Sequence, residues 1–237
     1  PRFKAAAVQT APVFLDTRAT IDKACSLIAE AARNGAAIVA FPEVFVPGYP
    51  YWNWITDPVT GSQWFEKLAR AAILVPGPEV DQLQRAARAA NIHVVIGVNE
   101  RSPVSLGAIY NTLLFIGPDG ALLGRHRKLV PTWAEKLTWT GGDGASLVTY
   151  DTSIGKLGGL ACGENTNTLA RFSLLAQGEL VHIQPKQMHD IIGHYNRFDI
   201  FDLRVNRAPQ APLALADEAT RQERLTPPQG LLPGTGE

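Results

Sequence analysis

The sequence predicts an α/β protein with a largely buried sheet. Through the first two thirds of the 237 residues, short apolar runs of strand length alternate with segments of helical periodicity. A Gly-Pro-Asp-Gly turn between two further apolar runs adds a hairpin to these β-α units. Strands that are apolar throughout are typical of sheets covered on both faces, and repeated β-α units are typical of the α/β class.

Five elements are expected in the first half of the chain. Apolar residues at helical spacing form a continuous stripe over residues 17–33, so this segment is predicted to be a helix. Gly35 ends this helix because glycine readily adopts the left-handed conformation. A second helix is expected over residues 79–90. Strands are predicted on three apolar runs, which are residues 3–9, 37–41 and 93–98.

The second half continues with the hairpin and further strands. The turn 117–120 joins the two hairpin strands, and a helix is expected to begin near Asn165. After about Arg207 the chain is rich in Pro, Ala, Gln and charge, which is typical of a segment that is disordered or ordered only against a partner. The strands expected here are residues 110–116, 122–123, 146–150 and 156–161. We therefore expect a single domain over residues 1–207 and a tail over residues 208–237.

Composition and charge exclude several classes of protein. Lys plus Arg and Asp plus Glu both number 22, and this zero net charge argues against a nucleic-acid binder or a binder of anionic membranes. No apolar run is long enough to span a membrane. Two cysteines cannot form a disulfide framework, so a cytoplasmic location is expected. The motifs of phosphate-binding loops, dinucleotide folds, serine nucleophile elbows and zinc sites do not occur, so we expect no cofactor and no metal.

Three reactive side chains stand where predicted strands give way to loops. They are Glu43, Lys128 and Cys162. Ligand sites of α/β sheets gather at such positions, so the three side chains are expected to converge. A thiol is a weak nucleophile until a base takes its proton, and a nearby ammonium stabilises negative charge. A cysteine, a carboxylate and an ammonium together suit attack on an electrophilic carbon bonded to nitrogen.

Each residue taken alone also fits a purely structural role. Cys162 fits a packed thiol at the end of a strand, and Cys25 lies in the apolar stripe of a helix. Glu43 fits a helix cap or a surface acid, and Lys128 fits one member of a solvated basic run. A different enzyme class is a Cys-His hydrolase, in which His182 would activate the thiol.

Three segments taken together resemble the nitrilase superfamily, in its nitrilase branch. Glu43 lies in FPEVFVPGYPYW, and Lys128 and Glu135 lie in HRKLVPTWAEKLTWTGGDG. Cys162 opens CGENTNTLARFSLLAQGE. The segments occur in the order of the family, and the first predicted strand also matches. The resemblance covers about residues 3–183 and resumes in IIGHYNRFDIFDLRVNR.

The resemblance implies an α-β-β-α sandwich that pairs into homodimers and can continue into helical filaments. It also implies cofactor-free hydrolysis of an organic nitrile to a carboxylic acid and ammonia. Cys162 would be the nucleophile, Glu43 the general base and Lys128 the group that stabilises charge, with Glu135 orienting or assisting. Alternatives with the same residues are an amidase and a nitrile-hydrating enzyme. A further alternative is a non-enzymatic, filament-forming assembly protein.

Substrate-binding residues are expected next to the catalytic ones, and the sequence departs from the family in two places. Tyr49, Trp52 and Trp133 are candidate pocket residues. Gly163 stands where many nitrilases have Trp, which leaves the pocket wall smaller there. Ile183 and Gln184 abut, whereas a long stretch separates the corresponding segments in the family, so an internal segment is expected to be absent at 183/184.

Overall fold

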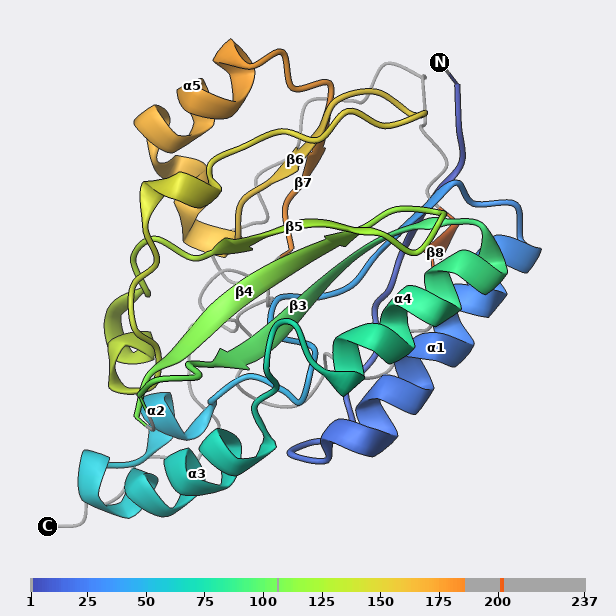
Figure 1. Cartoon of the computed structure of the whole chain (residues 1–237). Helices are drawn as coiled ribbons and strands as arrows, with labels where there is room; N and C mark the ends of the chain where they lie inside the picture. The colour runs from blue at the N-terminus through green and yellow to red at the C-terminus, as the bar shows by residue number, and fades with distance from the viewer. Residues whose placement is uncertain (1, 106, 186–200, 203–237) are drawn as a thin grey trace, which may run out of the picture. The chain divides into compact units, whose positions relative to one another are not determined.

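A computed structural model describes residues 2–105, 107–185 and 201–202 of the chain, the last two by their backbone. Two β-sheets face each other, and helices cover the outer face of each (Figure 1). This layering confirms the α-β-β-α sandwich. The predicted tail over residues 208–237 lies outside the described residues.

The described elements follow one another in β-α order along the first half of the chain. The helices are α1 Thr17–Arg33, α2 Trp52–Ile55, α3 Pro58–Ala71, α4 Pro78–Ala90 and α5 Thr168–Ala176. The strands are β1 Ala5–Ala7, β2 Ile38–Ala40, β3 His93–Arg101, β4 Ile109–Ile116, β5 Leu122–Arg127, β6 Leu157–Gly159, β7 Val181–Ile183 and β8 Phe201–Asp202. Short 3₁₀ turns are η1 Trp133–Leu137, η2 Gly144–Ser146 and η3 Cys162–Thr166.

The first sheet has the strand order β5-β4-β3-β2-β1-β8. Strands β1, β2 and β3 are parallel, and the hairpin strands β4 and β5 continue the sheet in antiparallel pairing. Strand β8 pairs antiparallel with β1. In the described part of the chain, the second sheet consists of β6 and β7, which are parallel.

Both faces of the first sheet are buried, as its apolar strands predict. Along β3, Val94 and Ile96 point toward the helices α1 and α4, whereas Val95 points toward the second sheet. This division follows from the two-residue period of a strand, which sends neighbouring side chains to opposite faces. Phe115 and Leu157 join Val95 in the layer between the two sheets. On the far side of the second sheet, Leu160 and two residues of α5 form a smaller cluster.

The helix α1 has the predicted bounds because the apolar stripe and the caps agree. The carboxylate of Asp16 accepts a hydrogen bond from the Ala19 N–H, which satisfies a donor at the helix start. The helix 79–90, the hairpin and all but one of the predicted strands are also present, although β1 is shorter than the predicted 3–9. None of the helices in the described part of the chain is long and apolar enough to cross a membrane.

One expected strand is absent, and one long helix was missed. Residues 146–150 do not form a strand, because η2 occupies their start and only Tyr150 makes an isolated bridge, to Leu157. The helix α3 was not expected, although Asp57 caps it and Pro58 occupies its first position, which together are a recognisable start signal. Its apolar residues Trp64, Phe65, Leu68 and Ala69 also lie at helical spacing, so the sequence contained the signal for this helix.

Candidate active site

Glu43 lies in the loop after β2 and is completely buried. The loop crosses the strand β3 so closely that a Cβ atom at Gly97 would lie 2.2 Å from the Val44 nitrogen and 2.5 Å from the Pro42 carbonyl oxygen. Only glycine fits at that position. Val44 has a φ of 44°, an uncommon conformation for a β-branched residue. The close crossing and the strained backbone together fix where the Glu43 carboxylate points.

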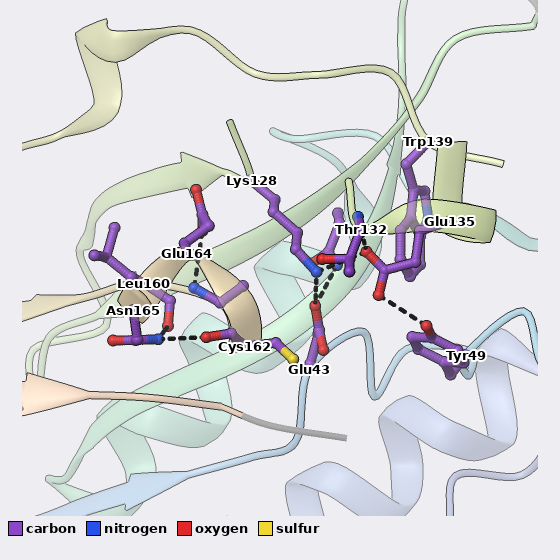
Figure 2. Close-up of polar contacts among 12 residues, drawn as sticks. Glu43, Tyr49, Lys128, Thr132, Glu135, Trp139, Leu160, Cys162, Glu164 and Asn165 are labelled. Carbon is purple, nitrogen blue, oxygen red and sulfur yellow. Dashed lines mark hydrogen bonds and ion pairs between the residues drawn. The ribbon is translucent and has the colours of Figure 1, made fainter. Parts of the chain in front are cut away.

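Lys128 follows β5 directly and brings an ammonium into the same buried space. Its backbone N–H donates to the Asn111 carbonyl on β4, which extends the hairpin ladder by one residue. Its Nζ donates to Glu43 Oε1 and to Glu135 Oε2, both at 2.8 Å (Figure 2). The Asn111 side chain also donates to Glu43 Oε1, at 2.7 Å. The predicted convergence of Glu43 and Lys128 is therefore observed, and Glu135 lies in direct contact with Lys128.

Glu135 is held from three sides on the turn η1. Its Oε2 accepts from the Thr132 backbone N–H at 2.6 Å as well as from Lys128. Its Oε1 accepts from the Tyr49 hydroxyl at 2.8 Å, and Trp54 Nε1 donates to that hydroxyl at 3.1 Å. A carboxylate with this many donors has one orientation, so Glu135 fixes the position of the Lys128 ammonium.

Cys162 begins the turn η3, immediately beyond the second sheet. Its φ is 46°, and its backbone N–H donates to the Pro185 carbonyl at 2.9 Å. Figure 2 shows its sulfur pointing toward the side chains of Glu43 and Lys128. The thiol is largely buried. The structure thus brings a thiol, a carboxylate and an ammonium from three distant parts of the chain to one point.

The charges in this site affect one another through their burial. Burial raises the pKa of the Glu43 carboxyl, and the nearby Lys128 opposes that effect. Burial by itself would lower the pKa of Lys128, but the two carboxylates together outweigh it, so its pKa is raised and it stays an ammonium. Burial, followed by the Glu43 charge, raises the pKa of the Cys162 thiol, whereas Lys128 and the Gly163 N–H lower it. The resting thiol is therefore protonated, and Glu43 is a stronger base than a solvated glutamate.

The candidate pocket residues occupy different environments. Tyr49 is buried and bonds to Glu135, and Trp52 is buried and stacks on Trp64 with ring centroids 6.3 Å apart. Trp133 is 81% exposed and has a φ of 48°. Gly163 faces Thr132, whose Oγ1 would lie 3.3 Å from a Cβ atom at that position. A substrate-binding role for these residues stays a prediction.

His182 is engaged away from the thiol. Its Nε2 lies 2.7 Å from the Asn165 side-chain oxygen, and its Nδ1 lies 2.7 Å from a carboxylate oxygen of Glu179. Both ring nitrogens therefore have partners other than Cys162. This arrangement favours Glu43 over His182 as the base.

Two buried polar residues of the site were not anticipated. The Asn111 side chain donates to Glu43. Glu164 accepts from two backbone N–H groups, that of Leu129 next to Lys128 and that of Ala161 next to Cys162. The available signal for Asn111 was an amide inside a mainly apolar strand, where an unpaired amide would be costly. Among the described residues, no group of three or more His, Cys, Asp or Glu side chains is arranged to hold a metal ion.

Removing the Tyr49 hydroxyl tests how Glu135 is held. Tyr49→Phe is expected to lower the free energy of unfolding by about 1–3 kcal/mol, because one buried carboxylate oxygen loses its donor. Urea denaturation measures this change. Tyr150→Phe is the matched control, since that ring packs against Phe115 in the layer between the sheets. Equal stabilities for the two variants would contradict the prediction.

Comparison with known proteins agrees with this geometry. The sequence profile of the carbon-nitrogen hydrolase family matches residues 4–201. The chain belongs to this family. This carbon-nitrogen hydrolase is 40–43% identical in sequence to nitrilases of the nitrilase superfamily, over about three quarters of its own length.

Two relatives and two solved structures illustrate the similarity. An aliphatic nitrilase of Rhodococcus rhodochrous is 43% identical over 182 residues, which are 76% of this chain and 49% of that protein. The bifunctional nitrilase/nitrile hydratase NIT4A of Lupinus angustifolius is 43% identical over 190 residues, 78% of this chain and 54% of that one. Nit3 of Saccharomyces cerevisiae, a member of branch 10 of the nitrilase superfamily, has a TM-score of 0.65 at 25% identity, covering 81% of this chain and 66% of its own. An amidase of Nesterenkonia sp. AN1 has a TM-score of 0.60 at 18% identity, covering 79% and 67%, and shows the fold alone.

The chain spans about half the length of the curated relatives that it matches. This carbon-nitrogen hydrolase nevertheless includes all three segments in which the candidate catalytic residues lie.

Proposed function

We propose that this carbon-nitrogen hydrolase is a nitrilase that converts an organic nitrile to a carboxylic acid and ammonia. The observation that carries the proposal is the Cys162 sulfur pointing at the buried Glu43–Lys128 pair. The names of the relatives, several of which are nitrilases at 40–43% identity, support the choice of substrate class.

The proposed reaction uses Cys162 as nucleophile and Glu43 as general base. Glu43 takes the thiol proton, and the sulfur adds to the nitrile carbon while the nitrile nitrogen gains the proton, which gives a thioimidate. Glu43 then deprotonates a water that adds to the same carbon. The C–N bond breaks, ammonia leaves with the protons, and a thioester remains. A second water releases the acid and restores the thiol.

Lys128 stabilises the charge that develops during these steps. Its ammonium is held at 2.8 Å by two carboxylates, so it needs no rearrangement when the nitrogen of the substrate becomes charged. Donors preorganised toward developing charge are worth about 10²–10³ in rate each. Glu135 orients the ammonium, and the Gly163 N–H beside the sulfur is a further donor.

The tetrahedral state can break down in a second way. If the thiol leaves instead of ammonia, the product is an amide, and the enzyme hydrates nitriles. The name of the NIT4A relative includes both activities for that protein. The same residues also suit amide hydrolysis, so product analysis has to separate the outcomes.

A panel of aliphatic, aryl and arylaliphatic nitriles tests the proposal directly. Ammonia, acid and amide are each measured, and acid with an equal amount of ammonia is expected from at least one nitrile. The matched control is Cys162→Ala, which removes the sulfur and should show neither product. Amide as the sole product would favour a nitrile-hydrating enzyme. The absence of any product from every nitrile in the panel would contradict the nitrilase assignment.

We further propose that the protein pairs into homodimers that can continue into helical filaments. The outward face of α5 supports this, because Leu169, Phe172 and Leu175 are all more than half exposed at helical spacing. Exposed apolar side chains gathered on one helix face are typical of an interface. Sedimentation of the intact protein tests pairing, and a monomer at micromolar concentration would contradict it.

The remaining expectations stay part of the proposal. The exclusion of nucleic acid and membrane as partners is supported by the zero net charge. A cytoplasmic location is supported by the two cysteines, which are too few for a disulfide framework. A single domain over residues 1–207 and an absent segment between Ile183 and Gln184 stay predictions. An intact mass of 25.6 kDa would contradict the absent segment.

A further inference from the structure

A further buried carboxylate, that of Glu164, lies on the side of Cys162 away from Glu43 (Figure 2). Glu164 is two residues after the nucleophile, and only 4% of its side chain is exposed. Its Oε2 accepts from the Ala161 N–H at 2.9 Å, and its Oε1 accepts from the Leu129 N–H at 2.7 Å. The His126 Nε2 lies 3.0 and 3.1 Å from the two oxygens. We call this set of contacts the Glu164 bridge.

The two backbone N–H groups of the Glu164 bridge belong to the two catalytic segments. Ala161 immediately precedes Cys162, and Leu129 immediately follows Lys128. The first segment extends from the second sheet and the other from the end of β5 in the first sheet. A single carboxylate thus spans the junction between the sheets at the point where nucleophile and ammonium must meet.

The His126 ring contacts both oxygens of the Glu164 carboxylate and is itself fixed. The ring is 2% exposed, and its Nδ1 lies 2.9 Å from the Ser146 Oγ. Because a carboxylate only accepts, Nε2 carries the hydrogen that faces Glu164. His126 is two residues before Lys128, so the ring also ties the bridge to the lysine segment.

We propose that Glu164 is a positioning residue that sets the Cys162 sulfur against Lys128 and Glu43, with His126 fixing its carboxylate. Cys162 has a strained φ of 46°, a conformation that persists only when the surroundings determine it. The Glu164 bridge holds the backbone immediately before Cys162, through the Ala161 N–H, and so helps to fix this conformation. The effect on turnover rests on the proposed function, whereas the effect on the thiol does not.

Glutamine cannot replace Glu164 in this role. Both carboxylate oxygens face N–H donors, so whichever oxygen becomes an amide NH₂ confronts a donor and one backbone contact is lost. The variant Glu164→Gln is therefore nearly isosteric but disconnects one catalytic segment from the other. A displacement of about 1 Å at reacting groups costs about 10²-fold in rate.

The experiment compares Glu164→Gln with Glu100→Gln in the full chain carrying Cys25→Ser. Glu100 is the matched control because it is equally buried and uses both oxygens, but its partners are the side chains of Thr112, Arg125 and Arg127. The rate at which iodoacetamide alkylates Cys162 is measured by mass spectrometry across pH, together with kcat and KM on a turned-over nitrile and the thermal midpoint.

We expect Glu164→Gln to displace the midpoint of the alkylation profile and to lower kcat about 10²-fold with a much smaller change in KM. Glu100→Gln should keep the midpoint of the parent while losing thermal stability. Identical profiles for the two variants would show that Glu164 is structural only and overturn the proposal. If Glu164→Gln is not obtained as a folded protein, Glu164→Asp is used in its place. The shorter aspartate side chain cannot reach the N–H groups of both Leu129 and Ala161.

The two readouts keep this proposal separate from the proposed function. If the parent protein hydrolyses no nitrile, the nitrilase assignment fails, but the alkylation profile still decides the role of Glu164. If the parent is active and the profile of Glu164→Gln is unchanged, only the positioning role fails.

Discussion

Replacing Lys128 by Met is expected to abolish turnover and to destabilise the fold by about 3–5 kcal/mol, the usual cost of removing one partner from a buried ion pair. The ammonium is the shared partner of Glu43 and Glu135, and all three side chains are at most 1% exposed. Without it, two carboxylates would face each other in a space that excludes water.

The pH dependence of this loss has a definite sign. Burial already raises the pKa of Glu43 in the native protein, and losing Lys128 removes the opposing influence. A carboxyl with a raised pKa in the folded state favours folding when protonated, and that contribution disappears as pH rises through the folded-state pKa. Lys128→Met should therefore recover stability relative to the parent near pH 4–5, around and just above the pKa of a free glutamate, about 4.3.

Urea denaturation of Lys128→Met at acidic and neutral pH measures both effects. The matched control adds Glu43→Gln and Glu135→Gln to the same variant, which removes the unpaired charges. This triple variant should regain most of the stability and none of the activity. A single variant as stable as the parent at pH 7 would show that the two carboxylates are not ionised together.

Replacing Glu43 by Gln is expected to lower kcat by about 10²–10⁴-fold, the usual contribution of a general base. Glutamine can still accept from Lys128 and Asn111 through its carbonyl oxygen, so the site should keep its shape. What is lost is the proton acceptor for the thiol of Cys162, whose pKa is raised. The thiol then stays protonated at neutral pH.

Steady-state kinetics against pH distinguishes this loss from misfolding. In the parent, activity should fall on the acid side with an apparent pKa above that of a free glutamate, because burial raises the pKa of Glu43. Glu66→Gln is the control, since Glu66 pairs with Arg70 on the surface. Full activity in Glu43→Gln would mean that another group takes the thiol proton.

Local patterns in the sequence predicted much of the fold. The stripe over residues 17–33 and the Asp16 cap act within one helix, and the helix has the predicted bounds. The expected strand over 146–150 is wrong because the second sheet pairs β6 with β7 and leaves only one bridge for that segment. The apolar content of a segment indicates that it is buried, but it does not show whether another strand is available to pair with it. A segment forms a strand only where such a partner strand is present.

The sequence by itself determined which reactive groups this protein has, their order, and the family to which they belong. Only the tertiary structure decided that Tyr49 bonds to Glu135, or that Glu164 joins the segments of Cys162 and Lys128. These contacts join residues up to 86 positions apart. A hydrogen bond depends on distance and direction to a few tenths of an ångström, and no spacing along the chain specifies that. The strand crossings and sheet packing that bring the groups together set those distances.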